Sequence, residues 1–362
     1  MQTMIFGAQG YARGAYKALK ALYPDNEVHF FMVTSAEGNP SSLCGLPVRE
    51  IASVSAEMSE DEKKNTRVLI ATPENVQPQI GHTLEEFGFT DHLALTSERW
   101  DDMMGKLYGV TGEFSPLRDM APGEKVPAIN VYMARSHKDK PLSVPFTLPG
   151  YMTPIQAGAA NTEEVIADVR DDTGDNISAR NGNYCELTGL YWVWKNVLCR
   201  NDDGGGENDL YGFAQYRRIL MLSEEDLRRI ARNDIDAVLP YPLSYEPDIN
   251  EHHKRYLKEN DWNALLSALE ELHPEYAADY GRILGQEYMF NYNVILAKKH
   301  VLRDYCEWVF PVLERTGELS VPKGCDRSDR YIGYMGETLE TLYFLKNRDK
   351  LNIAFTGCRL LV

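Results

Sequence analysis

The first hundred residues alternate between short apolar strands and helices, and this alternation restricts the fold more than any other feature. The pattern predicts strands at 4–7, 28–33, 68–71 and 92–95, and helices at 11–22 and 76–87. Strands that alternate with helices in this way form a parallel sheet with helices on both faces. We therefore expect an α/β protein that begins with a small Rossmann-like domain.

The pattern is interrupted after residue 105 and then resumes. Residues 106–126 mix Gly, Pro, Lys and Glu without periodicity, which is typical of a linker. The second region predicts strands at 129–134, 210–214, 237–239 and 291–298, and helices at 224–231, 262–272, 301–313 and 336–345. A chain of 362 residues also exceeds one typical domain. We expect a Rossmann-like domain at 1–105, a linker at 106–126 and a second domain at 127–362.

Charge and cysteine usage narrow the class of protein. The chain carries 54 acidic and 38 basic residues, a net charge of −16, which argues against a general nucleic-acid binder because such proteins need a basic face. The six cysteines are far apart and form no C-x-x-C pair. The chain opens with a strand rather than a signal peptide, and no apolar run approaches the roughly 20 residues of a membrane span. We expect a cytoplasmic protein whose membrane contact, if any, is peripheral and at the inner face.

A dense polar loop occupies the first half of residues 170–196. Its carboxylates and amides are Asp171, Asp172, Asp175, Asn176 and Asn181. Closely spaced carboxylates can hold a divalent cation that bridges a diphosphate, or accept hydrogen bonds from sugar hydroxyls. We therefore predict a ligand-facing loop, with Asp172 and Asp175 as candidate ligands of Mn²⁺ or Mg²⁺.

An aromatic helix follows this loop. Apolar residues recur at spacings of three and four from Leu187 to Leu198. Asn183 and Glu186 have the spacing of a capping box at its start. Its aromatic side chains, Tyr191 and Trp194 among them, fit a core better than a ligand contact. The helix is expected to hold the polar loop rigid.

The first strand ends in the glycine pattern Gly7-x-x-Gly10-x-x-x-Gly14. Glycines at a strand-to-helix turn let the backbone approach a phosphate at the helix N-terminus. The spacing differs from G-x-G-x-x-G, and no acidic residue ends the second strand. Dinucleotide binding and a purely structural tight turn both remain open.

Basic residues occur at two further places. Tyr216, Arg217 and Arg218 follow a buried strand, where ligands of open α/β sheets collect, and paired guanidinium groups suit a diphosphate. A solvated or ion-paired arginine pair is the alternative. His252 to Arg255 form a basic cluster, for which a solvated helix face is favoured over contact with an anionic acceptor.

Glu337 lies in the small-residue stretch 331–337, which is interpreted as a loop that opens the last helix. A carboxylate at a helix start is stabilised by the helix dipole. A carboxylate held there beside a cleft can also act as a general base toward a sugar hydroxyl. The sequence does not separate these two roles.

Several segments together resemble DUF4422, a bacterial family of glycosyltransferases from capsular and exopolysaccharide clusters that was long filed as a domain of unknown function. The resemblance spans about 127–347 and includes P-I-Q-A-G-A-A at 154–160, D-D-T-G-D-N-I-S at 171–178 and Y-C-E-L-T at 184–188. Further similar blocks lie at 129–138, 211–218, 293–299, 305–310 and 333–339. Their common order makes the resemblance specific.

The resemblance implies a GT-A-like fold and transfer of a sugar from a nucleotide-activated donor. It implies a nucleotide near His137, donor contacts at 171–181, and Arg217 and Arg218 on the diphosphate. Two positions differ from the family pattern. Gln215 replaces a histidine, and Gly336-Glu337-Thr338 keeps the glutamate of Ser-Glu-Arg but not its arginine. Residues 202–208 resemble an insertion.

The sequence as a whole favours a hexosyltransferase that uses a nucleotide-sugar, such as a UDP-hexose, and a glycan or lipid-linked oligosaccharide acceptor. Glu337 is the candidate base if the reaction inverts configuration. The main alternative is an NAD(P)-dependent, sugar-modifying oxidoreductase centred on residues 7–14. A third is a non-catalytic sensor of nucleotide-sugars.

Overall fold

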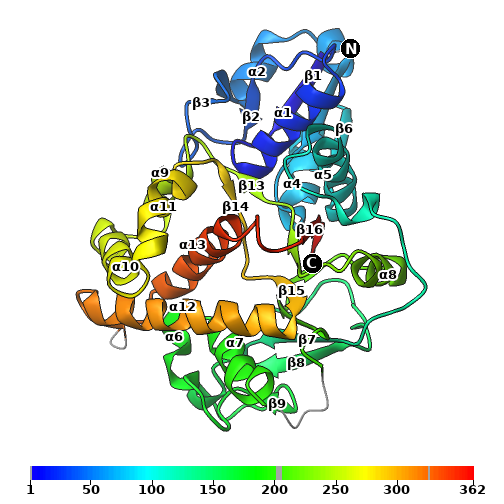
Figure 1. Cartoon of the computed structure of the whole chain (residues 1–362). Coiled ribbons are helices and arrows are strands. Elements are labelled where there is room, and N and C mark those ends of the chain that lie inside the picture. Colours follow the sequence, from blue (N-terminus) through cyan, green and yellow to red (C-terminus); the bar gives the residue numbers. More distant parts are fainter. Residues whose placement is uncertain (1, 201–205, 325–326) are drawn as a thin grey trace.

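A computed structural model describes residues 2–200, 206–324 and 327–362, so most of the expected insertion at 202–208 lies outside the described residues. The chain forms two α/β regions (Figure 1). The first contains a six-stranded sheet in the order β3-β4-β2-β1-β5-β6. Its strands are β1 (Gln2–Phe6), β2 (Phe31–Val33), β3 (Ser42–Leu43), β4 (Leu46–Glu50), β5 (Thr66–Ile70) and β6 (Asp91–Ala94). All but the short β3 run parallel.

Helices cover both faces of this first sheet, because its strands are apolar on both sides. They are α1 (Gly10–Leu22), α2 (Ile51–Glu57), α3 (Glu60–Lys64), α4 (Gln77–Glu86) and α5 (Ser97–Thr111), with a 3₁₀ turn η1 (Glu74–Val76). Met4 and Phe6 pack in one core with residues of α2 and α4. Ile5, which points the other way, packs in another core with residues of α1 and α5. The Rossmann-like arrangement expected from the sequence is therefore present.

The second sheet has nine strands, with its main path in the order β16-β12-β15-β10-β7-β8-β9. These are β16 (Ile353–Thr356), β12 (Ala237–Pro240), β15 (Ile295–Lys298), β10 (Leu210–Gln215), β7 (Ile129–Arg135), β8 (Met152–Gln156) and β9 (Val169–Arg170). Only β15 is antiparallel to its neighbours along this path. The other six strands therefore end at one common edge. A ribbon of β11 (Arg218–Leu220) and β17 (Cys358–Leu360) extends from β10.

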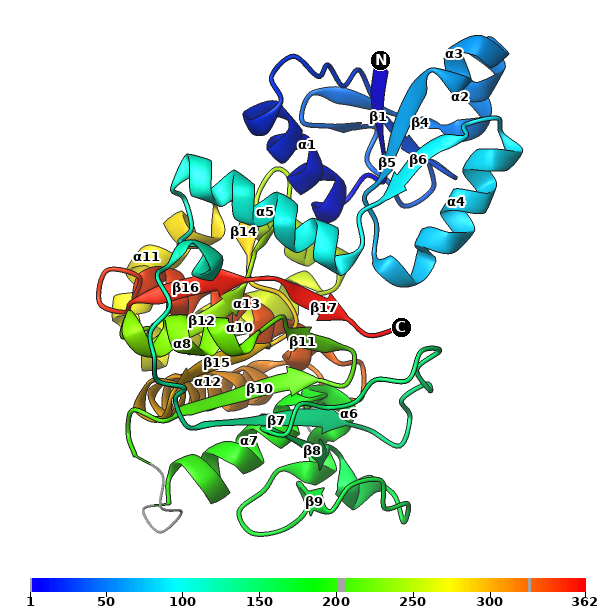
Figure 2. The same cartoon turned by 90° about the vertical axis from the view of Figure 1, so that its right-hand side faces the viewer.

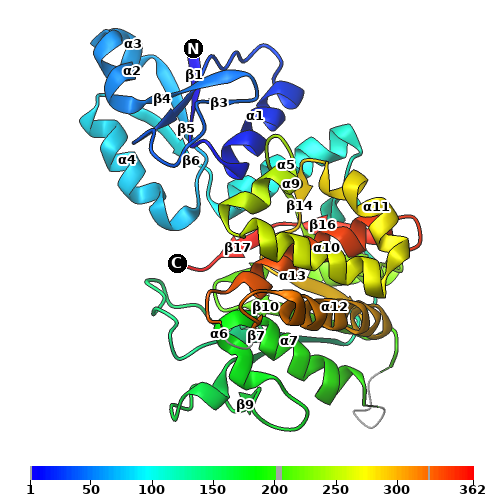
Figure 3. The ribbon, with the colours of Figure 1, turned by 90° about the vertical axis from the view of Figure 1, so that its left-hand side faces the viewer.

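Helices and a small hairpin complete the second region (Figures 2 and 3). The hairpin pairs β13 (Leu243–Ser244) with β14 (Tyr288–Met289). The α-helices are α6 (Asn181–Tyr184), α7 (Leu187–Val193), α8 (Glu224–Arg232), α9 (Ile249–His252), α10 (Glu259–Leu272), α11 (Pro274–Leu284), α12 (Lys299–Leu319) and α13 (Tyr331–Lys346). The 3₁₀ turns are η2 (Leu117–Asp119), η3 (Ala159–Asn161), η4 (Ser178–Arg180) and η6 (His253–Arg255), and α7 continues as a π-helical segment, η5 (Trp194–Leu198).

Three secondary-structure expectations need correction. Helix α5 runs to Thr111, so residues 106–111 are helix rather than linker. The strand expected at 291–298 begins only at Ile295, because Tyr292 and Asn293 adopt φ values of 82° and 49°, which interrupt an extended chain. Helix α13 begins at Tyr331, so the stretch 331–337 is helix and not a loop.

The two regions are tied together along α1, which lies against the hairpin β13–β14 (Figure 1). Lys17 donates to Glu287 at 2.7 Å, and Arg13 forms an ion pair with the same carboxylate. A further contact joins the start of α5 to β17, where the backbone N–H of Leu360 donates to Ser97 Oγ at 3.0 Å. Side chains from both regions share one hydrophobic core. Their relative placement therefore rests on apolar as well as polar contacts.

Gly14 of α1 is required by the packing of this helix on α5. A Cβ atom built there would lie 2.5 Å from the Trp100 ring. Gly14→Ala is therefore expected to destabilise the protein by about 1–3 kcal/mol, as overpacking does. The control is Gly281→Ala in α11, where a Cβ atom meets nothing within 4 Å, and about 0.5–1 kcal/mol of stabilisation is expected. Urea unfolding of both variants tests the contrast, and equal shifts would contradict it.

Candidate active site

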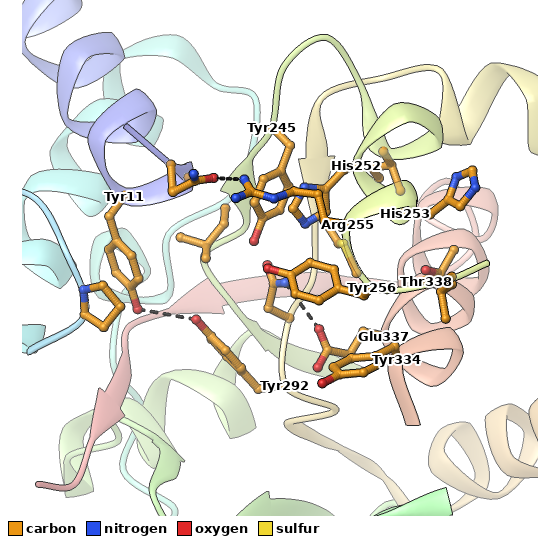
Figure 4. A pocket seen from close by; sticks show the side chains of 18 residues that line it. Tyr11, Tyr245, His252, His253, Arg255, Tyr256, Tyr292, Tyr334, Glu337 and Thr338 are labelled. Atoms are coloured by element: carbon orange, nitrogen blue, oxygen red, sulfur yellow. Dashed lines mark hydrogen bonds between the residues drawn. The ribbon is translucent and has the colours of Figure 1, made fainter. Parts of the chain in front are cut away.

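A pocket of about 360 Å³ lies between the two regions (Figure 4). On the first side it is lined by Gln9, Gly10 and Tyr11, which follow β1, and by Pro73, which follows β5. On the second side Tyr245 follows β13, and Asn291 and Tyr292 precede β15 at the edge where the parallel strands end. Ligands of open α/β sheets bind at this edge. Here the carboxyl edges of both sheets face one pocket.

Glu337 extends into this pocket from the second turn of α13 (Figure 4). Two glycines let the helix approach its neighbours closely enough for this. A Cβ atom at Gly336 would lie 2.7 Å from Leu187 and 2.9 Å from the side-chain oxygen of Asn293, and one at Gly333 would lie 3.1 Å from Cys185 Sγ. Because α13 begins at Tyr331, Glu337 does not lie at a helix start. Stabilisation by the helix dipole therefore does not explain its position.

The surroundings of Glu337 favour its neutral form. Burial raises the pKa of its carboxyl to about 7, and the nearby carboxylate of Glu186 contributes in the same direction. Asn291 Nδ2 donates to its Oε2 at 3.3 Å. A carboxylate whose pKa lies near neutral pH can both accept and return a proton under cellular conditions. This is the property of a general base.

Glu186 anchors a polar network beneath the pocket instead of capping a helix. Its Oε1 accepts from Gln215 Nε2 at 2.9 Å and from Asn293 Nδ2 at 2.8 Å. Burial raises the pKa of its carboxyl. It occupies the N-cap of α7 without a side-chain capping bond, and Asn183 bonds Gly324 and Ile332, so the expected capping box is wrong. Gln215, the position that differs from the family pattern, serves here as an amide donor.

The histidines expected on a solvated helix face are buried. His252 stacks on Tyr245 with ring centroids 3.5 Å apart, and His253 stacks on Trp262 at 4.0 Å. Burial lowers the pKa of His252 to about 4, so its ring is neutral at pH 7. Both line the pocket with Arg255. Three residues of the basic cluster therefore belong to the candidate site, whereas Lys254 does not line the pocket and pairs with Glu251.

Arg217 and Arg218 do not act as a matched pair. Arg218 lies with its guanidinium 4.1 Å from the centre of the Tyr292 ring and donates to Tyr11 Oη at 3.4 Å, so it borders the pocket. Its charge lowers the pKa of Glu337, although burial is the larger effect and raises it. Arg217 instead packs on the Tyr216 ring at 5.1 Å and donates to the carbonyl of Lys140 at 3.3 Å. The two guanidinium groups therefore contact different surroundings.

Arg217 and His137 lie in a second group, at the carboxyl end of β7. Both are close enough to Asp139 to stabilise its carboxylate, although burial is the larger effect and raises the pKa of Asp139. Arg217 Nε and His137 Nδ1 are buried and have no hydrogen-bond partner among the residues that the structure describes. Neither residue lines the interdomain pocket. Unpaired nitrogens of this kind suit an anionic ligand group.

Asp171, expected to face a ligand, is fully buried and holds the protein's own backbone. Its carboxylate accepts from the N–H groups of Gly158 and Ala159 at 2.8 and 3.0 Å. It also accepts from Ser178 Oγ at 2.5 Å. Asp171 thereby fixes the 154–160 segment against the polar loop. Its carboxylate has no face left for a ligand.

The next two carboxylates also have protein partners. Asp172 forms a two-bond ion pair with Arg170, with contacts of 3.1 and 2.6 Å. Asp175 accepts from Tyr191 Oη at 3.2 Å, and its backbone is bonded to Asn196. Across 2–200, 206–324 and 327–362, no three His, Cys, Asp or Glu side chains gather as metal ligands do. The donor set at Asp172 and Asp175 does not fit the metal site expected from the sequence.

The side-chain amides of the polar loop form hydrogen bonds within the loop and with the start of the following helix. Asn176 accepts from Ser178 N at 3.2 Å and donates to the carbonyl of Gly174 at 3.0 Å. Asn181 donates to the carbonyl of Cys185 at 2.7 Å and to Thr188 Oγ1 at 3.2 Å. The density of polar groups that suggested a ligand is therefore explained largely by internal hydrogen bonds.

The glycines after β1 also have structural explanations. Gly7 has φ of 127°, and a Cβ atom there would lie 2.5 Å from the Ala71 carbonyl. A Cβ atom on Gly10 would lie 3.1 Å from Leu243 and 3.2 Å from Tyr245, which belong to the second region. Gly14 meets Trp100 as described above. The pattern therefore reflects close packing at a turn and between regions, as the structural alternative expected.

The family model of DUF4422, described as a domain of unknown function, matches residues 131–348, more than half of the chain. The chain belongs to the DUF4422 family. Its match leaves the first region uncovered, and a search of curated proteins finds no match. The resemblance noted from the sequence is thus confirmed.

A solved structure, the WbbM bifunctional glycosyltransferase in its apo form, is similar to this DUF4422 protein with 25% sequence identity and a TM-score of 0.53. The similarity covers 65% of this chain but only 45% of that enzyme, so the chain spans less than half of the enzyme's length. The expected fold class, a Rossmann-like parallel sheet followed by a GT-A-like glycosyltransferase domain, is confirmed. None of the helices within the described residues is long and apolar enough to cross a membrane.

The sequence missed most residues of the pocket. Its aromatic lining is contributed by Tyr11, Tyr245, Tyr256, Tyr292 and Tyr334. These residues come from five separate segments, and no local motif connects them. The abundance of tyrosine, 21 residues, was the one signal available, and it does not identify positions.

Proposed function

We propose that this DUF4422 protein is a glycosyltransferase that moves a hexose from a nucleotide-sugar, such as a UDP-hexose, to a hydroxyl group of a glycan acceptor. The similarity to a solved glycosyltransferase supports the reaction class. The observation that carries the proposal is Glu337, a pocket carboxylate with a pKa raised to about 7. A base with this pKa suits the deprotonation of a sugar hydroxyl.

In the proposed reaction Glu337 removes the proton from the acceptor hydroxyl as its oxygen attacks the anomeric carbon of the donor sugar. The new C–O bond forms as the bond to the nucleoside diphosphate breaks, and the electron pair leaves with the phosphate oxygen. Direct attack of this kind inverts the anomeric configuration. Arg218 borders the pocket through Tyr11 and Tyr292, and a guanidinium there would stabilise the charge of the departing diphosphate.

The donor nucleotide is proposed to lie on the β7 side, near His137 and Arg217, whose unpaired nitrogens suit a phosphate. The Tyr216 ring packs against the Arg217 guanidinium group. The polar loop 171–181 contributes by fixing the segment 154–160, and any donor contact there would come from its exposed groups. We place the protein at the inner face of the membrane in capsular or exopolysaccharide assembly, with a lipid-linked acceptor.

The proposed activity is tested by an assay of sugar transfer. The full chain is incubated with a panel of nucleotide-sugars and octyl glycoside acceptors, with and without Mn²⁺, and release of nucleoside diphosphate is measured together with the sugar product. We expect one donor to be consumed in an acceptor-dependent reaction. Absence of turnover across the panel, with intact thermal unfolding, would contradict the proposed activity. The comparison with and without Mn²⁺ establishes the metal requirement directly.

Arg218→Met is expected to lower kcat by about 10²- to 10³-fold, because a preorganised donor to the leaving group is lost while the side-chain length is kept. The variant loses the contact with the Tyr292 ring and the hydrogen bond to Tyr11, so the free energy of unfolding should fall by about 1–2 kcal/mol, too little to unfold the protein at the assay temperature. Arg217→Met is the comparison, and here a rise in the donor KM is expected. If Arg218→Met left kcat unchanged, the role of this guanidinium would be refuted.

A further inference from the structure

We propose that the interdomain pocket is the acceptor site, and that it binds a saccharide whose ring packs against Tyr256 and Tyr334. This inference rests on the proposed function, because the base Glu337 marks where the reacting hydroxyl must lie. It goes beyond the family match, which does not include the first region that forms one wall of the pocket.

The aromatic side chains at the mouth of the pocket are arranged for a ring-shaped ligand (Figure 4). Tyr256 is 54% exposed, unusually high for an aromatic residue that lines a pocket. Its ring lies 5.3 Å from that of Tyr334 and 5.4 Å from that of His252. The apolar C–H face of a sugar packs well on such rings, whose hydroxyls remain free for hydrogen bonds.

Polar groups deeper in the pocket are available to sugar hydroxyls. Asn291 is 8% exposed, and its Oδ1 is buried without a hydrogen-bond partner among the residues described. Its Nδ2 already bonds Glu337, so the free oxygen points to a missing donor. A buried acceptor without a partner is costly, and a ligand hydroxyl would satisfy it. An apolar pocket with a few converging polar groups is typical of small-molecule sites.

The first region closes one side of this site. Gln9 bonds Arg255 across the pocket rim, and Arg255 donates to the carbonyl of Gly38 at 3.1 Å. Tyr11 Oη lies 3.5 Å from Tyr292 Oη, again across the two regions. These contacts hold the rim in one geometry. We therefore assign to the first region a role in acceptor recognition rather than in dinucleotide binding.

Charge argues against a nucleotide in this pocket. Glu337 is a carboxylate for part of its population at neutral pH and repels phosphate. Arg255 keeps its charge, but two of its nitrogens already donate to Gln9 and Gly38, and both pocket histidines have pKa values lowered by burial. The unpaired nitrogens suited to a nucleotide are those of His137 and Arg217, which lie outside the pocket, and Arg218, proposed to act on the leaving diphosphate, does not line it either.

The experiment is saturation-transfer NMR on the full chain, with octyl glycosides of glucose, galactose and N-acetylglucosamine and, separately, with UDP. We expect transfer to the sugar-ring protons of at least one glycoside. Tyr256→Ala should weaken that binding roughly tenfold, as expected for one lost aromatic contact. Tyr256→Phe should retain it, and UDP binding should be unchanged in both variants.

The matched control is Tyr23→Ala, which removes a tyrosine of similar exposure, 51%, that does not line the pocket. Pro73→Trp adds bulk to the pocket from the first region and should also reduce glycoside binding. Glycoside binding that is undetectable, or unchanged in Tyr256→Ala, would overturn the inference, as would selective loss of UDP binding. Saccharide binding without any sugar transfer would instead refute the proposed function and leave a saccharide-binding site at Tyr256.

Discussion

Glu337→Gln is expected to lower the rate of sugar transfer by about 10²- to 10⁴-fold, the usual contribution of a general base. Glutamine keeps the size of the side chain and can still accept from Asn291, so the pocket should keep its shape. Steady-state kinetics with the donor identified from the panel provide the measurement. Loss of less than about tenfold would show that another group removes the proton.

The pH dependence of the same residue gives an independent signature. The wild-type rate should fall as pH drops below about 7, because the protonated carboxyl cannot accept a proton. The free energy of unfolding should change in the opposite direction and increase as pH drops. The folded-state pKa is raised above the ordinary value, so the contribution of Glu337 is fully present below pH ~4.5 and is lost as pH rises through about 7.

Glu337→Gln removes this titration, so the variant should become more stable relative to wild type as pH rises from 5 to 8. The difference is on the order of 3 kcal/mol at most, from the free energy per pKa unit. Urea unfolding at several pH values measures it. A variant that loses activity without this stability gain would place Glu337 in a less buried setting than the structure shows.

Asp171→Ala is expected to destabilise the fold by about 2–5 kcal/mol. The substitution leaves two buried N–H groups and the Ser178 hydroxyl without their acceptor, and each such group costs about 1–3 kcal/mol. Thermal or urea unfolding provides the measurement. The 154–160 segment should also become accessible to hydrogen exchange.

Asp172→Ala is the matched control one residue away. Its carboxylate is partly exposed and paired with the adjacent Arg170, and such surface pairs contribute about 0–1 kcal/mol. The two aspartates are indistinguishable by sequence pattern. Similar losses of stability in both variants would contradict the distinction that the structure draws between them.

The sequence predicted correctly those strands that appear as continuous apolar runs. The runs at 4–7, 68–71, 129–134 and 210–214 became β1, β5, β7 and β10, because buried parallel strands are continuous apolar runs. The strand predicted at 291–298 is present only from Ile295, because Tyr292 and Asn293 have positive φ values and Tyr292 lies at the edge of the pocket instead of in the sheet. Apolar content alone gave no sign of that change.

The sequence predicted a site residue only where its role does not depend on residues far away in the chain. Glu337 was identified as a candidate base, although its helix was expected to start later. The pocket around it could not be foreseen, because Tyr11 and Tyr292 meet across 281 positions of the chain. The polar loop was misleading for a physical reason: Asp and Asn bond backbone groups as readily as they bind ligands.

The strand β17 has a consequence for how the protein is made. Residues 353–361 contact three parts of the chain at once. The N–H of Phe355 donates to the carbonyl of Ser115 after α5, the N–H of Leu360 donates to Ser97 Oγ, and the N–H of Leu361 donates to the carbonyl of Arg217. Nearly all of these 362 residues must therefore have left the ribosome before the backbone at Arg217 gains its contact with Leu361. A nascent chain halted earlier carries a complete first sheet and a second sheet that still lacks β16 and β17.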